Sequence, residues 1–418
     1  MKGKLILLLA CMFIAYMDLC AQPKMLYFDP QTAVGGSVGN MLTDVEYIPL
    51  ETTKESLFGD IAFLVVTDKY IVVYDRDTNR LYFFDKQGKF IKRYEDNKTT
   101  IRHLQYDAVK NALLIYDIKK SYNLSQKELQ DLNENPRAKD VSKFAGAYYY
   151  YLEDVRKERI EKVRNFRYVL ANPVLFDKDK FVSGALYANK NAKDSIAYEL
   201  KVIGSDGNVL QNYLPYNQHN ANVYAVNPGN IRFFKTARPD SLLFTRPYHY
   251  SFYALTPGGV KELYKLILPM GISVPEAFEE TPFKNGFELD EYRARNNSFA
   301  WGIKRLLPYG QYLFFELDIF RNARNSSFLY DTNKGTVYNL SKIASDSTNT
   351  YLPLWGNPVY NFDDGYTYTY QSSLSMFGNM KEMASKTPQY PPVLKTYFDN
   401  SKESANPVIV RFKIKENK

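Results

Sequence analysis

The sequence predicts an all-β fold, a six-bladed β-propeller with four antiparallel strands in each blade. Tyr and Phe supply 36 and 27 of the 418 residues, against only 2 Trp, and aromatic residues favour strands over helices. Short apolar runs recur along the chain, and turns rich in Asp, Asn and Gly separate them. Because one such repeat cannot bury both of its faces alone, the repeats must pack against one another.

The clearest repeat covers residues 70–94. Three apolar runs, at residues 70–74, 81–84 and 90–94, are split by Asp-Arg-Asp-Thr-Asn and by Asp-Lys-Gln-Gly-Lys. Val, Ile, Tyr and Phe suit a pleated, half-buried surface, while Asp, Asn and Gly form tight turns. The pattern is typical of a compact antiparallel meander, and it predicts one propeller blade.

Five further repeats follow, of which the sixth is weaker. Their predicted strands are 101–106, 113–116, 147–152 and 159–166; 167–176, 181–187, 197–203 and 209–213; 230–235, 241–245, 251–255 and 260–268; 300–307, 312–318, 327–330 and 336–339; and 358–362, 366–370 and 407–413. Three insertions separate or interrupt them, near residues 125–146, 275–297 and 375–397. The first two are polar and tolerate helix, and the third reads as a mixed loop. Insertions of this length are usually functional loops or disordered segments.

A propeller must also close its ring. Residues 45–50 precede the first repeat and have no local partner, so we expect them to form the outer strand of the last blade, beside residues 407–414. The propeller is therefore placed at residues 44–418, after a leader at residues 22–43. The leader contains Gly-Gly-Ser-Val-Gly, a match to Gly-x-Ser-x-Gly. A nucleophile elbow needs a strand before it and a helix after it, so this match is interpreted as a flexible lead-in.

Residues 1–21 are typical of a secretory signal peptide. Lys2 and Lys4 precede an apolar stretch, and Leu-Cys-Ala before Gln22 forms a small-residue cleavage site. The apolar run is too short for a confident membrane span, and no later run of about 18 apolar residues exists. We therefore expect export to the periplasm or the outer-membrane surface. A soluble product beginning at Gln22 is favoured over a chain lipidated at Cys11, although Leu-Leu-Ala-Cys matches a lipobox.

Composition excludes several classes of function. Both cysteines, Cys11 and Cys20, lie in the signal segment, so the mature chain has no disulfide framework, Cys-zinc site or thiol nucleophile. The formal charge of +8 is spread over separate Lys and Arg residues rather than gathered in a stripe, so no nucleic-acid partner is expected. The remaining partners are a carbohydrate or peptide ligand, or another protein of the cell envelope.

Several segments resemble the exported six-bladed β-propeller family that is widespread in Bacteroidetes. The resemblance rests on Tyr-Ile-Pro-Leu-Glu-Thr-Thr at residues 47–53, on the hairpin at residues 84–91, on Asn-Pro-Val-Ile-Val at residues 406–410, and on the fourth repeat. The first repeat is also similar to NHL repeats. The family usually has Gly-x-Gly-Pro-Gly-Glu-Tyr after the first blade, where this chain has Glu-Asp-Asn-Lys-Thr-Thr. The resemblance implies the fold and export, and it implies no settled activity.

No motif predicts catalysis, a cofactor or a metal. His103, His219 and His249 lack metal-ligand spacing, the turn at residues 75–79 lacks the Gly and Glu of a calcium loop, and no phosphate loop occurs. The predicted function is therefore a non-catalytic binding or scaffold propeller of the envelope. The alternative is a metal-dependent hydrolase or lyase with its site in the central channel, because acidic residues are plentiful.

We expect a ligand to bind at one end of the central channel. In a four-stranded blade, the loop between the second and third strands and the crossing between blades share one face, and aromatic and basic side chains concentrate there. The predicted site is a basic funnel with an aromatic rim, suited to an anionic or sugar-like ligand. Its candidate residues are His103, Arg232, Arg246, Tyr248, His249 and Trp301. The competing interpretation is that these side chains only pack between blades.

Overall fold

The structure, a computed structural model, describes residues 22–120, 125, 145–163, 173–177, 179–191, 193–236, 238, 240–319, 326–362 and 365–415, with Asn361 described by its backbone alone. The predicted signal segment, most of the insertion near residues 125–146 and part of the predicted strands at 159–166 and 167–176 lie outside these residues. Within the described part, no helix is long and apolar enough to cross a membrane.

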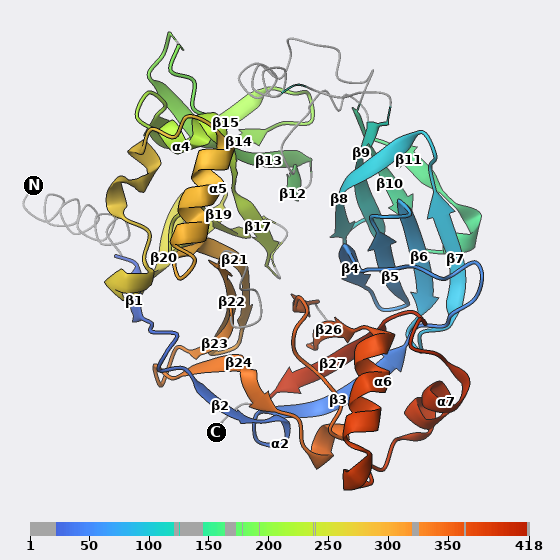
Figure 1. The fold of residues 1–418 in the computed structure, drawn as a ribbon. Helices are drawn as coiled ribbons and strands as arrows, with labels where there is room; N and C mark the ends of the chain where they lie inside the picture. Colours follow the sequence, from blue (N-terminus) through green and yellow to red (C-terminus); the bar gives the residue numbers. More distant parts are fainter. Residues whose placement is uncertain are drawn as a thin grey trace, which may run out of the picture.

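Six β-sheets form a ring (Figure 1), as the sequence predicts. Each blade runs outward from its first strand at the channel. Blade 1 contains β4 (Phe63–Val66), β5 (Tyr70–Asp75), β6 (Arg80–Asp85) and β7 (Phe90–Glu95), and blade 2 contains β8 (Thr99–Asp107), β9 (Ala112–Lys119), β10 (Ala145–Tyr151) and β11 (Ile160–Lys162). Blade 3 contains β12 (Val174–Phe176), β13 (Lys180–Leu186), β14 (Ile196–Ile203) and β15 (Val209–Asn217), with β16 (Gly229–Asn230) beside β13.

The other three blades follow in sequence, and each gains an outer strand from the start of the chain. Blade 4 contains β17 (Arg232–Lys235), β18 (Leu242–Thr245), β19 (Ser251–Thr256) and β20 (Gly259–Ile267), and blade 5 contains β21 (Ala300–Tyr309), β22 (Tyr312–Ile319), β23 (Ser327–Asp331) and β24 (Val337–Ala344). Blade 6 contains β25 (Tyr360–Asn361), β26 (Thr367–Gln371) and β27 (Val408–Ile414), completed by β3 (Leu42–Pro49).

Blade strands bury both faces, which explains their continuous apolar runs. Successive side chains of a strand point to opposite faces of the sheet. In β5, Ile71 and Val73 pack in a cluster with Tyr368 of blade 6, while Val72 and Tyr74 pack with residues of blade 2. The core is therefore a set of layers between neighbouring blades, and each layer needs the bulky Tyr and Phe side chains in which the sequence is rich.

The ring closes as the sequence predicts. β3 pairs antiparallel with β27, with Val408 opposite Pro49 and Val410 opposite Tyr47. The hydroxyl of Tyr47 also accepts a hydrogen bond from Asn349 Nδ2 (3.0 Å), which joins β3 to the loop between blades 5 and 6. The strand that directly precedes blade 1 and the last described strand thus share a single sheet, which closes the ring.

The leader was expected to be a flexible lead-in, and in the structure it is ordered into strands. β1 (Lys24–Tyr27) pairs parallel with β20 of blade 4, and β2 (Val34–Ser37) pairs parallel with β24 of blade 5. The short helix α2 (Val38–Met41) then leads into β3. Residues 24–49 therefore form a belt that adds an outer strand to blades 4, 5 and 6 in turn. Ser37 lies in extended backbone (φ −123°), without the strained geometry of a nucleophile elbow.

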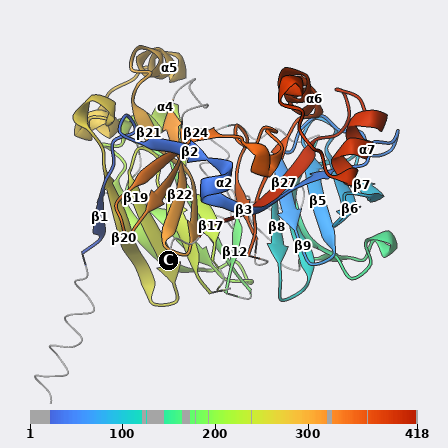
Figure 2. The same ribbon diagram turned by 90° about the horizontal axis from the view of Figure 1, so that it is seen from below.

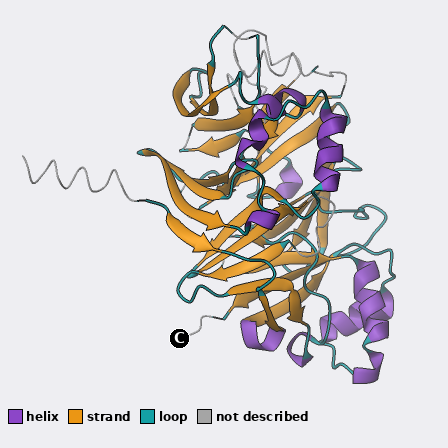
Figure 3. Cartoon of the chain, turned by 60° about the vertical axis from the view of Figure 1, so that its left-hand side comes forward, coloured by secondary structure: helices purple, strands orange, loops and turns teal. Residues whose placement is uncertain are grey.

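The long helices lie on one face of the disk, as Figures 2 and 3 show. Between blades 4 and 5, the chain forms short 3-10 helices, η3 (Met270–Ile272) and η4 (Glu276–Glu280), and then α5 (Gly286–Arg295). The insertion expected to be a mixed loop at residues 375–397 contains helical turns instead: α6 (Ser373–Glu382), η7 (Ala384–Lys386) and α7 (Pro392–Asn400). The remaining short elements are η2 (Val155–Lys157), α4 (Asn222–Val226) and η6 (Ser347–Asn349).

Candidate functional site

A polar cavity of about 220 Å³ lies between the innermost strands of blades 4 and 5. Four of the six predicted site residues line it, namely Arg232, Arg246, Tyr248 and Trp301. The rest of its wall comes from the segment before β17, from β21 and β22, and from α5, and includes Asn227, Asn230, Arg293, Gly302 and Asp318. Segments spread between residues 227 and 318 thus converge on one cavity.

The loop between β18 and β19 is fixed by a buried ion pair. Arg246 Nε donates to Glu199 Oε2 (2.6 Å), and a second guanidinium nitrogen donates to Oε1, so the pair is bidentate. The side chain of Glu199, on β14, is only 1% exposed. Burial disfavours the charge of Arg246, but the carboxylate of Glu199 outweighs that effect and raises the pKa of Arg246 above its ordinary value. Arg246 therefore joins blade 3 to blade 4.

Tyr248 adopts a backbone conformation that is uncommon for a bulky residue, with φ +64°. Its amide donates to the carbonyl of Trp301 (2.9 Å), and its ring lies 4.9 Å from that of Phe278 in η4. Gly302 permits this approach, because a Cβ there would lie 3.1 Å from the Tyr248 nitrogen. Strained residues of this kind persist where the surrounding structure holds them, and they concentrate at functional sites.

Trp301 forms the packed base beneath Tyr248. Its side chain is buried (1% exposed), and its ring contacts those of Tyr248, Phe278, Tyr292 and Phe299. The guanidinium of Arg293 lies 5.3 Å from the centre of its ring. In this position Trp301 supports the residues that border the cavity, and the half-buried ring of Tyr248 is the more accessible aromatic surface.

Arg232, on β17, is a second cation of the cavity. Its side chain is 45% exposed, and Asp318 Oδ2 lies 3.9 Å from it, beyond hydrogen-bonding distance. Asp318 is also 3.3 Å from Lys304, so one carboxylate serves two cations. Partial desolvation lowers the pKa of Arg232, and the charges of Asp318 and Glu316 oppose that shift. This arginine is therefore only partly compensated by its described neighbours.

The two predicted histidines are not among the residues that line this cavity. His249 Nε2 lies 2.9 Å from Glu279 Oε1, which attaches the β18–β19 loop to η4. Burial raises the pKa of Glu279, but the neighbouring side chains of His249, Arg246 and Tyr224 together outweigh it, so the pKa lies below its ordinary value. His103, on β8 of blade 2, packs edge-on against Phe63, and burial lowers its pKa to about 4.

Several residues of the site were not predicted from the sequence. Glu199 stands in the middle of a blade 3 strand, and Arg293 lies in an insertion helix. Both are ordinary surface-type residues in sequence, and only the tertiary fold brings them to the cavity. Asp318 could have been predicted more easily than these two residues. It ends the predicted strand 312–318, and the end of the second strand of a blade faces the same side as the loops between blades.

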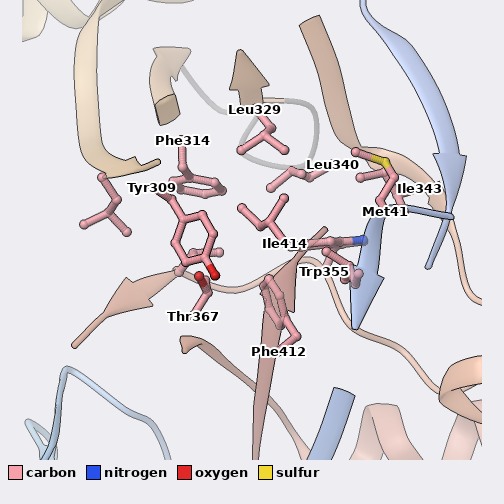
Figure 4. Close-up of a pocket in the computed structure, with 13 residues that line it drawn as sticks. Met41, Tyr309, Phe314, Leu329, Leu340, Ile343, Trp355, Thr367, Phe412 and Ile414 are labelled. Atoms are coloured by element: carbon pink, nitrogen blue, oxygen red, sulfur yellow. The ribbon is translucent and has the colours of Figure 1, made fainter. Parts of the chain in front are cut away.

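Two other hollows differ from this cavity. Figure 4 shows an apolar pocket between blades 5 and 6, lined by side chains such as Phe314, Trp355 and Phe412. Its volume of about 20 Å³ corresponds to a packing gap the size of a water molecule. A wider hollow of about 750 Å³ borders Tyr94, Lys98 and Tyr148 of blades 1 and 2. Its lining includes Lys120, Ala145 and Val163, which adjoin residues outside the described ranges.

The described residues do not form a metal site. No group of three or more His, Cys, Asp or Glu side chains within the described ranges is arranged to hold a metal ion. In the cavity the ligand-type groups are one carboxylate and two Asn amides among three arginines, a donor set that repels cations. What this arrangement offers chemically is hydrogen-bond donors and positive charge.

The ring of six sheets defines the class of this protein as a six-bladed β-propeller. The chain belongs to the DUF5128 family, described as "6-bladed beta-propeller", whose profile matches residues 29–246. This match confirms the predicted fold and the resemblance to a six-bladed propeller family. No protein with a curated description matches the sequence.

Several solved structures resemble this chain at low sequence identity. A protein of Bacteroides fragilis that is proposed to be exported is 14% identical, with a TM-score of 0.60, and the match covers 94% of this chain and 100% of that one. A DUF4221 family member from Bacteroides vulgatus is 11% identical, with a TM-score of 0.47, over 90% of this chain and 98% of that one. A streptogramin B lyase is 9% identical, with a TM-score of 0.35, over 79% and 80%. At these identities, the first match shows the fold alone.

Proposed function

We propose that this protein is an exported, non-catalytic propeller of the cell envelope that binds a small glycan or peptide ligand in the cavity between blades 4 and 5. The observation that carries the proposal is the convergence of Arg232, Arg246, Tyr248 and Trp301 on one polar hollow. A rigid ring with loops on one face is well suited to binding, because the scaffold holds the loop residues in place. Export follows from the predicted signal at residues 1–21, with the periplasm or the outer-membrane surface as the destination.

The size of the cavity limits the ligand. Sites for drug-sized molecules usually measure about 300–1,000 Å³. A cavity of about 220 Å³ is smaller, and it suits a single sugar ring, a sugar end group or one amino-acid residue. The metal-dependent hydrolase or lyase is the weaker candidate, because the described residues supply no group of metal ligands. Stoichiometric metal in the purified protein would favour that enzyme.

Binding to arrays of glycans and peptides tests the proposal, with the purified protein compared with two variants. Tyr248→Ala removes the accessible aromatic surface of the cavity, and Tyr198→Ala removes a 39% exposed tyrosine on blade 3 as a matched control. We expect Tyr248→Ala to abolish binding and Tyr198→Ala to preserve it, with urea midpoints confirming that both variants fold. Binding that survives Tyr248→Ala would place the ligand elsewhere and refute the proposal.

A further inference from the structure

The charges around the cavity are unbalanced. Arg232 and Lys304 share the single carboxylate of Asp318, at 3.9 and 3.3 Å. Arg293, from α5, also lines the cavity, and Asp290 Oδ1 lies 4.0 Å from its Nη1. Because Arg232 and Lys304 share one carboxylate, their end of the cavity has more positive than negative charge, which favours an anion.

Arg246, the third arginine that lines the cavity, does not add to this excess of positive charge. Arg246 is neutralised by its bidentate pair with Glu199, and that pair is nearly buried. Its guanidinium is therefore a positioning group for the loop that bears Tyr248. Arg232 differs from it in accessibility, since its side chain is 45% exposed, and among the described residues it makes no hydrogen bond. A planar guanidinium in this state is well suited to a carboxylate, which it can bind through two parallel hydrogen bonds.

The rest of the wall suits a hydroxylated ring. Asn227 and Asn230 line the cavity together with Arg232, and a side-chain amide can both donate to and accept from hydroxyl groups. Asp318 adds an acceptor. The half-buried ring of Tyr248 is held in one orientation by its contacts with Phe278 and Trp301, and aromatic rings pack against the apolar faces of sugar rings.

From these contacts we infer that the ligand is a sugar acid, a single hydroxylated ring bearing one carboxylate. Arg232 binds the carboxylate, Tyr248 packs against the ring, and the two asparagines and Asp318 bind its hydroxyls. The inference rests on the proposed function and makes it more specific, because it selects acidic sugars from the glycans and peptides considered above. An amino-acid or peptide carboxylate offers the same charge without the hydroxylated ring.

Titration calorimetry on the whole purified protein distinguishes these ligands. The probes are glucuronate, galacturonate and N-acetylneuraminate as acidic sugars, glucose and galactose as neutral sugars, and acetate and glycylglycine as carboxylates without a sugar ring. We expect at least one acidic sugar to bind ten or more times more tightly than its neutral counterpart and than either simple carboxylate. In Arg232→Gln, that binding should weaken at least tenfold, whereas Arg238→Gln, at an exposed arginine of the same blade, should leave it unchanged.

The possible failures separate the two proposals. Neutral sugars or glycylglycine binding as tightly as the acids, with loss of binding in Tyr248→Ala, would overturn the sugar-acid inference and preserve the binding function. Acid binding that Arg232→Gln leaves intact would overturn the role of Arg232 and with it the inference. No binding by any acidic sugar would also overturn the inference, and the glycan and peptide arrays would then decide the proposed function on their own.

Discussion

Arg411 and Glu46 form an ion pair across the seam where the ring closes, with Arg411 Nη2 2.7 Å from Glu46 Oε2. Arg411 lies on β27, the last described strand. Glu46 lies opposite it on β3, which comes before blade 1 in the sequence. The same guanidinium lies 4.6 Å from the centre of the Tyr366 ring. This pair marks the register that joins the two ends of the propeller.

Closure of the ring should depend on its buried strand residues more than on this pair. Because Glu46 is half exposed, replacing Arg411 by Gln should lower the free energy of unfolding by about 1 kcal/mol or less. Ile409, on the same strand, is fully buried between blades 6 and 1, so Ile409→Ala should cost about 2–5 kcal/mol. Urea unfolding measures both. If both variants lost the same free energy of unfolding, buried apolar residues would not be the main contribution to closure of the ring.

The belt formed by residues 24–49 should be sensitive to the side chain at Gly35. A Cβ at this position would lie 2.4 Å from the carbonyl oxygen of Lys342, so β2 could not keep its place on β24. We expect Gly35→Ala to lower the free energy of unfolding by about 1–3 kcal/mol and to speed proteolysis of the belt. Gly59→Ala is the control, because no atom lies within 4 Å of its added Cβ. Similar behaviour of the two variants would show that the belt is not tightly docked.

The blades were predictable from the sequence because their hairpins are local. Turns such as Asp-Arg-Asp-Thr-Asn are encoded within a few residues, and the predicted run at residues 81–84 lies inside β6 (Arg80–Asp85). The closing strand was predictable as well, since residues 45–50 had no other partner. The parallel strands β1 and β2 were not. They are four residues long, and their partners lie more than 200 residues away, so no local pattern marks them.

The candidate site was predictable only in part, for a similar reason. Loop position in a blade was sufficient to bring Arg232, Tyr248 and Trp301 to one cavity, because every blade repeats the same topology. It could not show that Arg246 would pair with Glu199, or that His249 would turn to Glu279, since both partners come from other elements. Side-chain pairing depends on tertiary neighbours that one sequence does not reveal.

Loss of the carboxylate at Glu199 should be strongly destabilising. Glu199→Gln leaves the guanidinium of Arg246 nearly buried without its counter-charge, which typically costs about 3–5 kcal/mol. Glu153→Gln is a matched control, because its pair with Arg159 is largely exposed and should be worth about 1 kcal/mol or less. The measurement is the urea midpoint of each variant. If the two midpoints agree, the Glu199–Arg246 pair does not hold blades 3 and 4 together.

Phe278 should control the packing around Trp301. Its ring, in η4, contacts Tyr248, Tyr292 and Trp301, so Phe278→Ala should admit water to Trp301 and shift its fluorescence to longer wavelength. The protein has only two tryptophans, and a Trp355→Phe background isolates the signal of Trp301. Phe287→Ala, at an exposed position of α5, should leave the spectrum unchanged. An unshifted spectrum in Phe278→Ala would mean that η4 does not shield Trp301.

Hydrogen–deuterium exchange, with and without a saturating concentration of the acidic sugar that binds most tightly, tests most directly whether the cavity between blades 4 and 5 is the binding site. We predict slower exchange of backbone amides in residues 227–232 and 245–249, which line the cavity or flank it, with unchanged exchange in residues 70–85 of blade 1. Protection confined to residues 94–99 and 145–148, beside the other hollow, or no protection anywhere, would contradict the account.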